Sequence, residues 1–168
     1  MQFKEIIKYT ENLNLLYIEE DLTTVKDTIE LLNIFFKNVD IEMDGESALE
    51  TYKRNFYQNG KYYDLIITES NLPRISGDIL ISEIKKLNPE QVIIVLSLKA
   101  EEEKLISFIK NGVKDFIKKP IVMMELQDAL YPLSKALSTD RSREEIKKID
   151  NLDSEDVDKL NPAYKILC

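Results

Sequence analysis

Strand-like and helix-like segments alternate along this chain from about residue 13 to about residue 137. Such alternation is typical of a parallel sheet that is covered by helices on both faces. Short apolar, β-branched runs predict strands at residues 15–18, 39–43, 63–68, 92–96 and 113–117. Apolar residues at helical spacing predict helices at residues 23–36, 45–57, 79–87, 100–110 and 122–137. The pattern therefore indicates an α/β fold.

A single domain with short appendages fits the length of 168 residues. We expect a lead-in over residues 1–12, the domain over residues 13–138 and a charged extension over residues 139–168. The extension mixes both charges and has only weak helical periodicity, so we expect it to lie outside the core. It could dock on the domain, pair with another chain or stay mobile.

Several classes of function are disfavoured by composition. The chain has no histidine, which excludes Ser-His-Asp catalysis and histidine-bound zinc. Its net charge of −8 argues against direct nucleic-acid binding. No apolar run is long enough to cross a membrane, and Cys168 is the only cysteine. We expect a cytoplasmic protein without a membrane anchor or a disulfide.

Charged and hydroxyl side chains stand where four of the predicted strands end. Glu19 and Glu20 follow the first strand, Glu69 the third, Ser97 the fourth and Lys119 the fifth. The carboxyl ends of parallel strands meet at one edge of a sheet, where such folds bind ligands. Any one of these residues alone is more simply a solvated loop charge or a helix cap. Together, in this order, they predict a site.

The chemistry of that site follows from its charges. Carboxylates held close together repel one another, so a pKa must rise unless a cation intervenes. Mg²⁺ suits a site of two carboxylates that keeps several waters. A metal ion, an ammonium and a hydroxyl around one carboxylate would neutralise a phosphoryl group during transfer.

These motifs resemble the response-regulator receiver domain, the CheY-like module of two-component signalling. The resemblance rests on the acidic pair after the first strand, on the segment from Tyr63 through Pro73 to Gly77, and on Lys119-Pro120. It covers about three quarters of the chain. It implies a doubly wound, five-stranded parallel sheet of order 2-1-3-4-5, and a Lys-Pro peptide bond that is often cis.

The resemblance also implies roles for individual residues. Glu69 stands at the phosphoacceptor position, Ser97 and Phe116 stand at the switch positions, and Lys119 neutralises charge. If Mg²⁺ binds, the implied ligands are Glu20, Glu69 and the carbonyl of Asn71, with Glu19 further out. Without Mg²⁺, the simplest partner for Lys119 is Glu69.

One departure from the family changes the expected function. The family acceptor is an aspartate, whereas this chain has Glu69. The added methylene displaces the carboxylate by roughly 1 Å, which can cost on the order of 10²-fold in a positioned reaction. Leu98 replaces a small residue and would narrow access to the site. We therefore expect a pseudo-receiver, not an enzyme, that signals through protein–protein contact. The alternative is a Mg²⁺-dependent receiver that a histidine kinase phosphorylates on Glu69.

The expected partner of this protein is a histidine kinase or a downstream effector, and a homodimer is a further option. This contact would use the face formed by the fourth predicted helix, the fifth strand and the fifth helix, if apolar residues are exposed there. The candidate residues, most of which packing in the core would explain, are Ile106, Phe108, Phe116, Ile121 and Met123.

A metal-dependent hydrolase is disfavoured, because the first strand does not end in an Asp-x-Asp spacing. The extension is too short and too acidic for a DNA-binding output.

Overall fold

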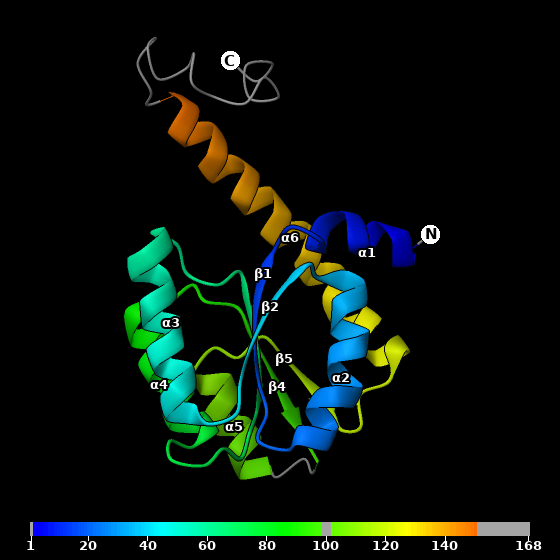
Figure 1. The fold of residues 1–168 in the computed structure, drawn as a ribbon, viewed down its shortest axis with the longest axis vertical. Helices are drawn as coiled ribbons and strands as arrows, with labels where there is room; N and C mark the ends of the chain where they lie inside the picture. The colour runs from blue at the N-terminus through cyan, green and yellow to red at the C-terminus, as the bar shows by residue number, and fades with distance from the viewer. Residues whose placement is uncertain (1, 99–101, 151–168) are drawn as a thin grey trace.

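Five parallel strands form one sheet, in the order β2-β1-β3-β4-β5. The sheet lies between two sets of helices (Figure 1). The computed structural model describes residues 2–98 and 102–150, with side chains for residues 2–98 and 103–140. The strands are β1 (Asn14–Ile18), β2 (Asn38–Glu42), β3 (Leu65–Glu69), β4 (Ile93–Ser97) and β5 (Asp115–Lys118). This is the CheY-like topology that the resemblance implied. Each strand end lies within two residues of its predicted position.

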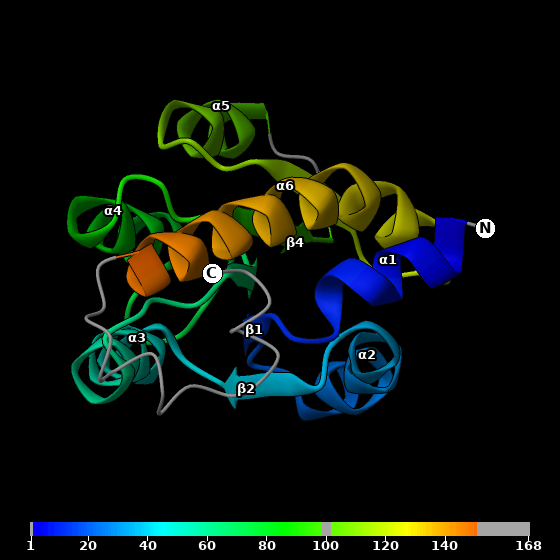
Figure 2. The same ribbon diagram turned by 90° about the horizontal axis from the view of Figure 1, so that it is seen from above.

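Helices cover both faces of the sheet. They are α1 (Gln2–Thr10), α2 (Leu22–Phe35), α3 (Gly45–Asn59), α4 (Gly77–Leu87), α5 (Glu102–Lys110) and α6 (Met123–Asp150). Alternate residues of β1 enter two separate cores: Leu15 and Tyr17 pack with α1, α2 and α6, whereas Leu16 and Ile18 pack with α3, α4 and α5. Figure 2 shows these two layers from above. The predicted start of α5 at residue 100 lies outside the described residues.

Aspartate side chains cap the N-termini of two helices, α2 and α3. Asp21 caps α2 by accepting from the backbone N–H of Thr24 at 3.0 Å. Asp44 caps α3 in the same way, accepting from Ser47 N at 2.8 Å. An Asp side chain satisfies a backbone donor that has no partner within the helix. Helix α3 ends at Gly60, whose φ of 70° is left-handed.

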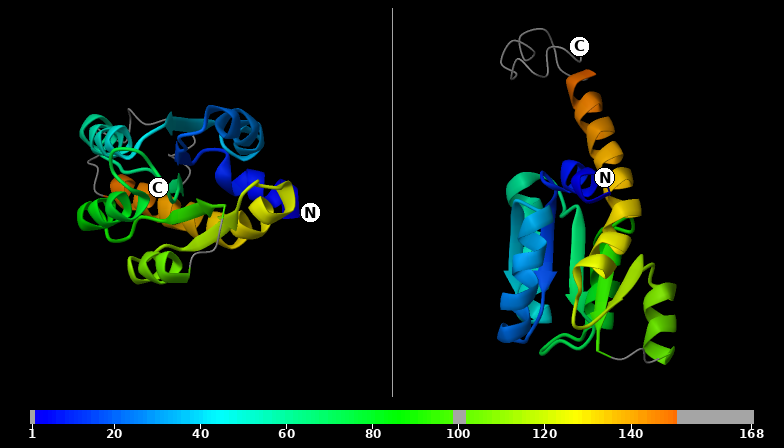
Figure 3. Two further views of the ribbon diagram at one scale, coloured as in Figure 1. Left: turned by 90° about the horizontal axis from the view of Figure 1, so that it is seen from below. Right: turned by 90° about the vertical axis from the view of Figure 1, so that its right-hand side faces the viewer.

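The last helix is longer than the sequence pattern predicted. We expected it to end at residue 137, but α6 continues without a break to Asp150. Residues 138–150 contain no glycine or proline and are rich in Arg, Glu and Lys, so nothing local stops the helix. Figure 3 shows α6 projecting beyond the sheet. Residues 151–168, the remainder of the predicted extension, lie outside the described part of the chain.

The predicted lead-in forms a helix that packs on the domain. The side chain of Ile6 is fully buried in the core formed with α2 and α6. Thr10 Oγ1 donates to the carbonyl of Phe35, at the end of α2, at 2.7 Å. Tyr131 of α6 donates its hydroxyl to Glu5 at 3.2 Å. Helix α1 therefore joins α2 to α6.

None of the helices in the described residues is long and apolar enough to cross a membrane.

If α1 is part of the domain, the substitution Ile6→Ala lowers the stability of the whole domain. We expect a loss of about 2–5 kcal/mol in the free energy of unfolding, because the change leaves a cavity among buried side chains. Urea denaturation followed by circular dichroism measures this loss. The exposed neighbour Lys4 gives the control, Lys4→Ala, which should change the stability little. Equal stabilities for the two variants would mean that α1 contributes nothing to the core.

Candidate functional site

The structure brings the predicted site residues to one edge of the sheet. Glu69 and Ser97 are the last residues of β3 and β4, and Glu19 and Lys119 directly follow β1 and β5. The ammonium of Lys119 lies 2.6 Å from Glu19 Oε2. It also donates a hydrogen bond to Glu69 Oε2. One lysine therefore bridges two carboxylates that are fifty and one hundred residues away from it in sequence.

Both carboxylate oxygens of Glu69 have partners within the domain. Oε1 accepts from Ser70 Oγ at 3.1 Å and from the backbone N–H of Asn71 at 3.2 Å. Oε2 accepts from Lys119. Only 5 % of Glu69 is exposed. The carboxylate therefore points into the protein, where it closes the turn that follows β3.

A glycine allows the chain to make that turn. The N–H of Gly77 donates to the carbonyl of Ser70 at 3.2 Å, which brings the start of α4 against the end of β3. A Cβ at Gly77 would lie 2.4 Å from this carbonyl oxygen, closer than real Cβ contacts allow. The backbone can approach this closely only without a side chain.

The burial of these charged groups shifts the pKa values of Glu19 and Lys119. Only 1 % of Glu19 is exposed, and burial raises its pKa above the ordinary value of 4.5 in spite of the nearby Lys119. For Lys119, burial lowers the pKa, but its bonds to Glu19 and Glu69 raise it more, so that the net shift is upward. Two carboxylates therefore share one ammonium, and their bonds to it favour the charged form of Lys119.

Glu20 is placed differently from its neighbour. It is exposed, and it lines a pocket of about 370 Å³ together with Glu69 and Asn71. Within the described part of the chain, no group of three or more acidic or cysteine side chains is close enough to hold a metal ion. Glu69 Oε2 is paired with Lys119, and the predicted ligands Glu20, Glu69 and Asn71 include only two carboxylates. Binding of Mg²⁺ by these residues stays a prediction.

The two switch positions lie on adjacent strands. The Oγ of Ser97 is 3.5 Å from that of Ser70. Phe116 of β5 is half-buried and packs on Phe108 of α5, with ring centroids 6.1 Å apart. Leu98 is 67 % exposed at the mouth of the site. The peptide bond between Lys119 and Pro120 is cis, as the resemblance implied.

Sequence reasoning missed three residues of this region. Ser70 joins Glu69 to the switch position, and its place directly after Glu69 was a usable signal. Lys104 donates to Asn71 Oδ1 at 2.7 Å, although 33 residues separate them, and no sequence pattern indicates this contact. The hydroxyl of Tyr17 is buried, and burial raises its pKa.

Comparison with known proteins agrees with this geometry. The chain matches the response regulator receiver domain family over residues 15–131. It is 34 % identical over 92 residues to the chemotaxis protein CheY of Thermotoga maritima, a match that covers 55 % of this chain and 72 % of that protein. It is 24 % identical over 120 residues to the transcriptional regulatory protein ZraR of Escherichia coli O157:H7, covering 71 % of this chain. That match spans only 26 % of ZraR, so the chain corresponds to about a quarter of this longer relative.

Solved structures give the same result. A response regulator receiver domain protein from Clostridium thermocellum superimposes with a TM-score of 0.64 and 25 % identity, covering 74 % of this chain and 96 % of that one. The CheX-CheY-BeF3-Mg+2 complex from Borrelia burgdorferi gives a TM-score of 0.63 and 25 % identity, covering 71 % and 87 %. The chain therefore belongs to the receiver domain family of two-component signalling.

The bridge formed by Lys119 predicts a pH-dependent effect of its removal. In Lys119→Met, two buried carboxylates lose their common cation, and we expect a loss of about 3–5 kcal/mol of stability at neutral pH. The pKa of Glu19, already raised, should rise further. The folded variant then binds more protons than the unfolded chain above pH 4.5, so its stability should recover as the pH falls towards that value.

Urea denaturation at neutral pH and at about pH 5 tests this prediction. The exposed neighbour Lys118 supplies the control Lys118→Met, which should behave like the native protein at both pH values. A Lys119→Met protein with native stability at neutral pH would show that the bridge does not support the fold.

Proposed function

We propose that this receiver domain is a pseudo-receiver, which signals by protein–protein contact and not by aspartyl phosphorylation. The observation that carries the proposal is the state of Glu69, which is buried and has both oxygens engaged. An acceptor must offer one oxygen to an incoming phosphoryl group at a defined distance and angle. Glu69 instead ties the end of β3 to Lys119 and to the following turn. We expect the protein to act in the cytoplasm, as receiver domains generally do.

The alternative function is phosphorylation of Glu69 by a histidine kinase with Mg²⁺. The retained acids favour it, since Glu20, Glu69 and Asn71 line one pocket and Lys119 stands beside them. For this function the pair between Lys119 and Glu69 would have to open so that a metal ion and a phosphoryl group could enter. The pseudo-receiver needs no such rearrangement, so we prefer it.

Incubation with acetyl phosphate and Mg²⁺, read by intact-mass spectrometry, separates the two functions. We expect no adduct on the native protein, because Glu69 is both too long and fully engaged. We expect an adduct of roughly 80 Da on Glu69→Asp, in which the shorter side chain restores the spacing of an acyl phosphate acceptor. The matched variant Glu69→Gln should stay unmodified. An adduct on the native protein that disappears in Glu69→Gln would establish Glu69 as a working acceptor.

For the partner, we propose the face formed by α5, β5 and the start of α6. Of the five apolar residues predicted there, Ile106 is 53 % exposed, Phe108 is buried, and Phe116, Ile121 and Met123 are partly buried in the cores. The core explanation therefore accounts for most of them. The exposed apolar surface comes instead from residues that the sequence did not indicate, namely Ile109, Val122 and Met124. These exposed apolar side chains support the proposal that this face binds a partner.

Self-association through this face is open to direct measurement. If the partner is a second copy of the chain, the native protein dimerises with rising concentration in sedimentation equilibrium, and Ile106→Lys/Ile109→Lys remains monomeric. Tyr57→Lys provides the control, since Tyr57 is 87 % exposed on α3, which packs beside β2 at the opposite edge of the sheet from β5. A native protein that is monomeric at every concentration would rule out the homodimer and leave an effector as the partner.

A further inference from the structure

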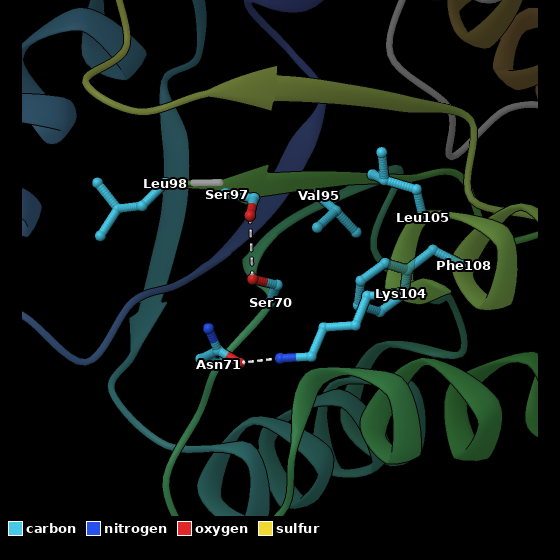
Figure 4. A pocket seen from close by; sticks show the side chains of 8 residues that line it. All are labelled: Ser70, Asn71, Val95, Ser97, Leu98, Lys104, Leu105 and Phe108. Carbon is cyan, nitrogen blue, oxygen red and sulfur yellow. Dashed lines mark hydrogen bonds between the residues drawn. The ribbon is translucent and has the colours of Figure 1, made fainter. Parts of the chain in front are cut away.

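The polar side chains beside α5, at the carboxyl edge of the sheet, already have partners within the domain. In the pocket of about 210 Å³ that Figure 4 shows, the Oγ of Ser70 lies 3.5 Å from that of Ser97, and Lys104 donates to Asn71. Phe108, which also lines this pocket, is buried. A surface that is open to a partner lies elsewhere, along the outer edge of the sheet at β2.

Strand β2 has a single neighbour in the sheet, β1, so half of its backbone groups face away from the sheet. The carbonyl of Glu42 accepts from the N–H of Glu19 in β1's continuation at 3.0 Å. Because the direction alternates along a strand, Asp40 also faces β1, whereas Val39 and Ile41 present their N–H and C=O groups outward. Among the described residues, none bonds to these outward groups. Figure 2 shows no helix on the outer side of β2.

The side chains of β2 differ in chemistry between its two faces, because successive residues point to opposite faces. Asp40 and Glu42 share the face toward α3, where Thr51 of α3 donates to Glu42 Oε1 at 2.6 Å. Ile41 lies on the opposite face and is 38 % exposed, as is Met43 directly after the strand. The edge therefore offers carboxylates on one face and apolar surface on the other.

Each of the two carboxylates keeps one oxygen for a further partner. Tyr63 donates to Asp40 Oδ2 at 2.5 Å, and Thr51 donates to Glu42 Oε1. In the part of the chain that the structure describes, no hydrogen bond or ion pair reaches Asp40 Oδ1 or Glu42 Oε2. Arg54 stands behind Glu42, where it donates to Thr51 at 3.1 Å. Two carboxylates beside one guanidinium favour a partner that is basic.

We propose that β2 binds an extended, basic segment of a partner protein by strand addition. The backbone of this segment pairs with the outward N–H and C=O groups of Val39 and Ile41. Its lysine or arginine side chains oppose Asp40 and Glu42 on one face, and its apolar side chains pack beside Ile41 on the other. The edge thus selects a segment in which basic and apolar residues alternate.

A second copy of this chain fits the same edge less well. Pairing of two β2 strands would bring the acids of both copies together, and like charges on opposed strands are destabilising. Charged side chains are one means by which proteins prevent such association of edge strands. The same charges attract a basic strand. This surface lies at the opposite edge of the sheet from β5, and it does not depend on whether Glu69 can be phosphorylated.

NMR of the isotope-labelled full chain with a short peptide of alternating Lys and Val tests the proposal. We expect saturable shifts along β2, and amide hydrogen exchange slowed about tenfold or more at Val39 and Ile41, because strand addition bonds these outward groups. The amides of Asp40 and Glu42, which already face β1, should change little. A peptide of alternating Lys and Pro carries the same charge but cannot form the ladder, so it should protect neither outward amide.

Variants that keep the fold test the charges. Asp40→Asn/Glu42→Gln removes both charges but keeps an acceptor for each neighbouring hydroxyl, and it should weaken binding of the Lys-Val peptide by about tenfold at low salt. Glu103→Gln/Glu125→Gln removes two charges from exposed residues on α5 and α6, and it should bind the peptide like the native protein.

Three results would overturn strand addition at β2. One is saturating binding of the Lys-Val peptide without protection of Val39 and Ile41, which would indicate attraction by charge alone. Another is equally tight binding of the Lys-Pro peptide. The third is a loss of affinity in Glu103→Gln/Glu125→Gln as large as that in Asp40→Asn/Glu42→Gln, which would show that net charge and not this edge attracts the peptide.

Discussion

The bridge that Lys119 makes between Glu19 and Glu69 is the interaction on which this structure depends. It joins the ends of β1, β3 and β5 through a single ammonium, with all three side chains nearly buried. Buried charges are tolerated only when they are paired and hydrogen-bonded. Here two carboxylates share one cation, and burial raises the pKa of Glu19 in spite of that cation. The edge of the sheet is held together by this triad of charged side chains.

This triad also bears on what the edge can do. Glu69 is held by Lys119, Ser70 and the backbone of Asn71, which supports the proposal that it links strands and does not accept a phosphoryl group. Ser70 extends the same network to the switch position at Ser97. Ser97 also lines a second pocket, together with Asn71 and with Lys104 of α5. Lys104 donates to the Asn71 side chain, and the backbone N–H of Asn71 donates to Glu69, so one residue connects α5 to Glu69.

Outside the segment that matches the family, the chain adds structure at both ends. Helix α1 precedes residue 15 and packs on α2 and α6 through Ile6, Thr10 and Glu5. Helix α6 continues beyond residue 131 and projects from the domain. Because α1 packs on both α2 and α6, it helps to set the direction in which α6 leaves the domain.

The sequence by itself determined the order of strands and helices between residues 14 and 137, and which charged residues stand at strand ends, because apolar periodicity, caps and strand ends are local properties. It could indicate that Glu19, Glu69 and Lys119 meet, since parallel strands end at one edge, and even that Lys119 would pair with Glu69. Only the tertiary structure decided that Glu19 is buried while Glu20 is exposed, that Lys104 reaches Asn71, and that α1 packs on α6. Burial and contact between distant segments depend on how helices pack across the sheet, and no local pattern specifies that packing.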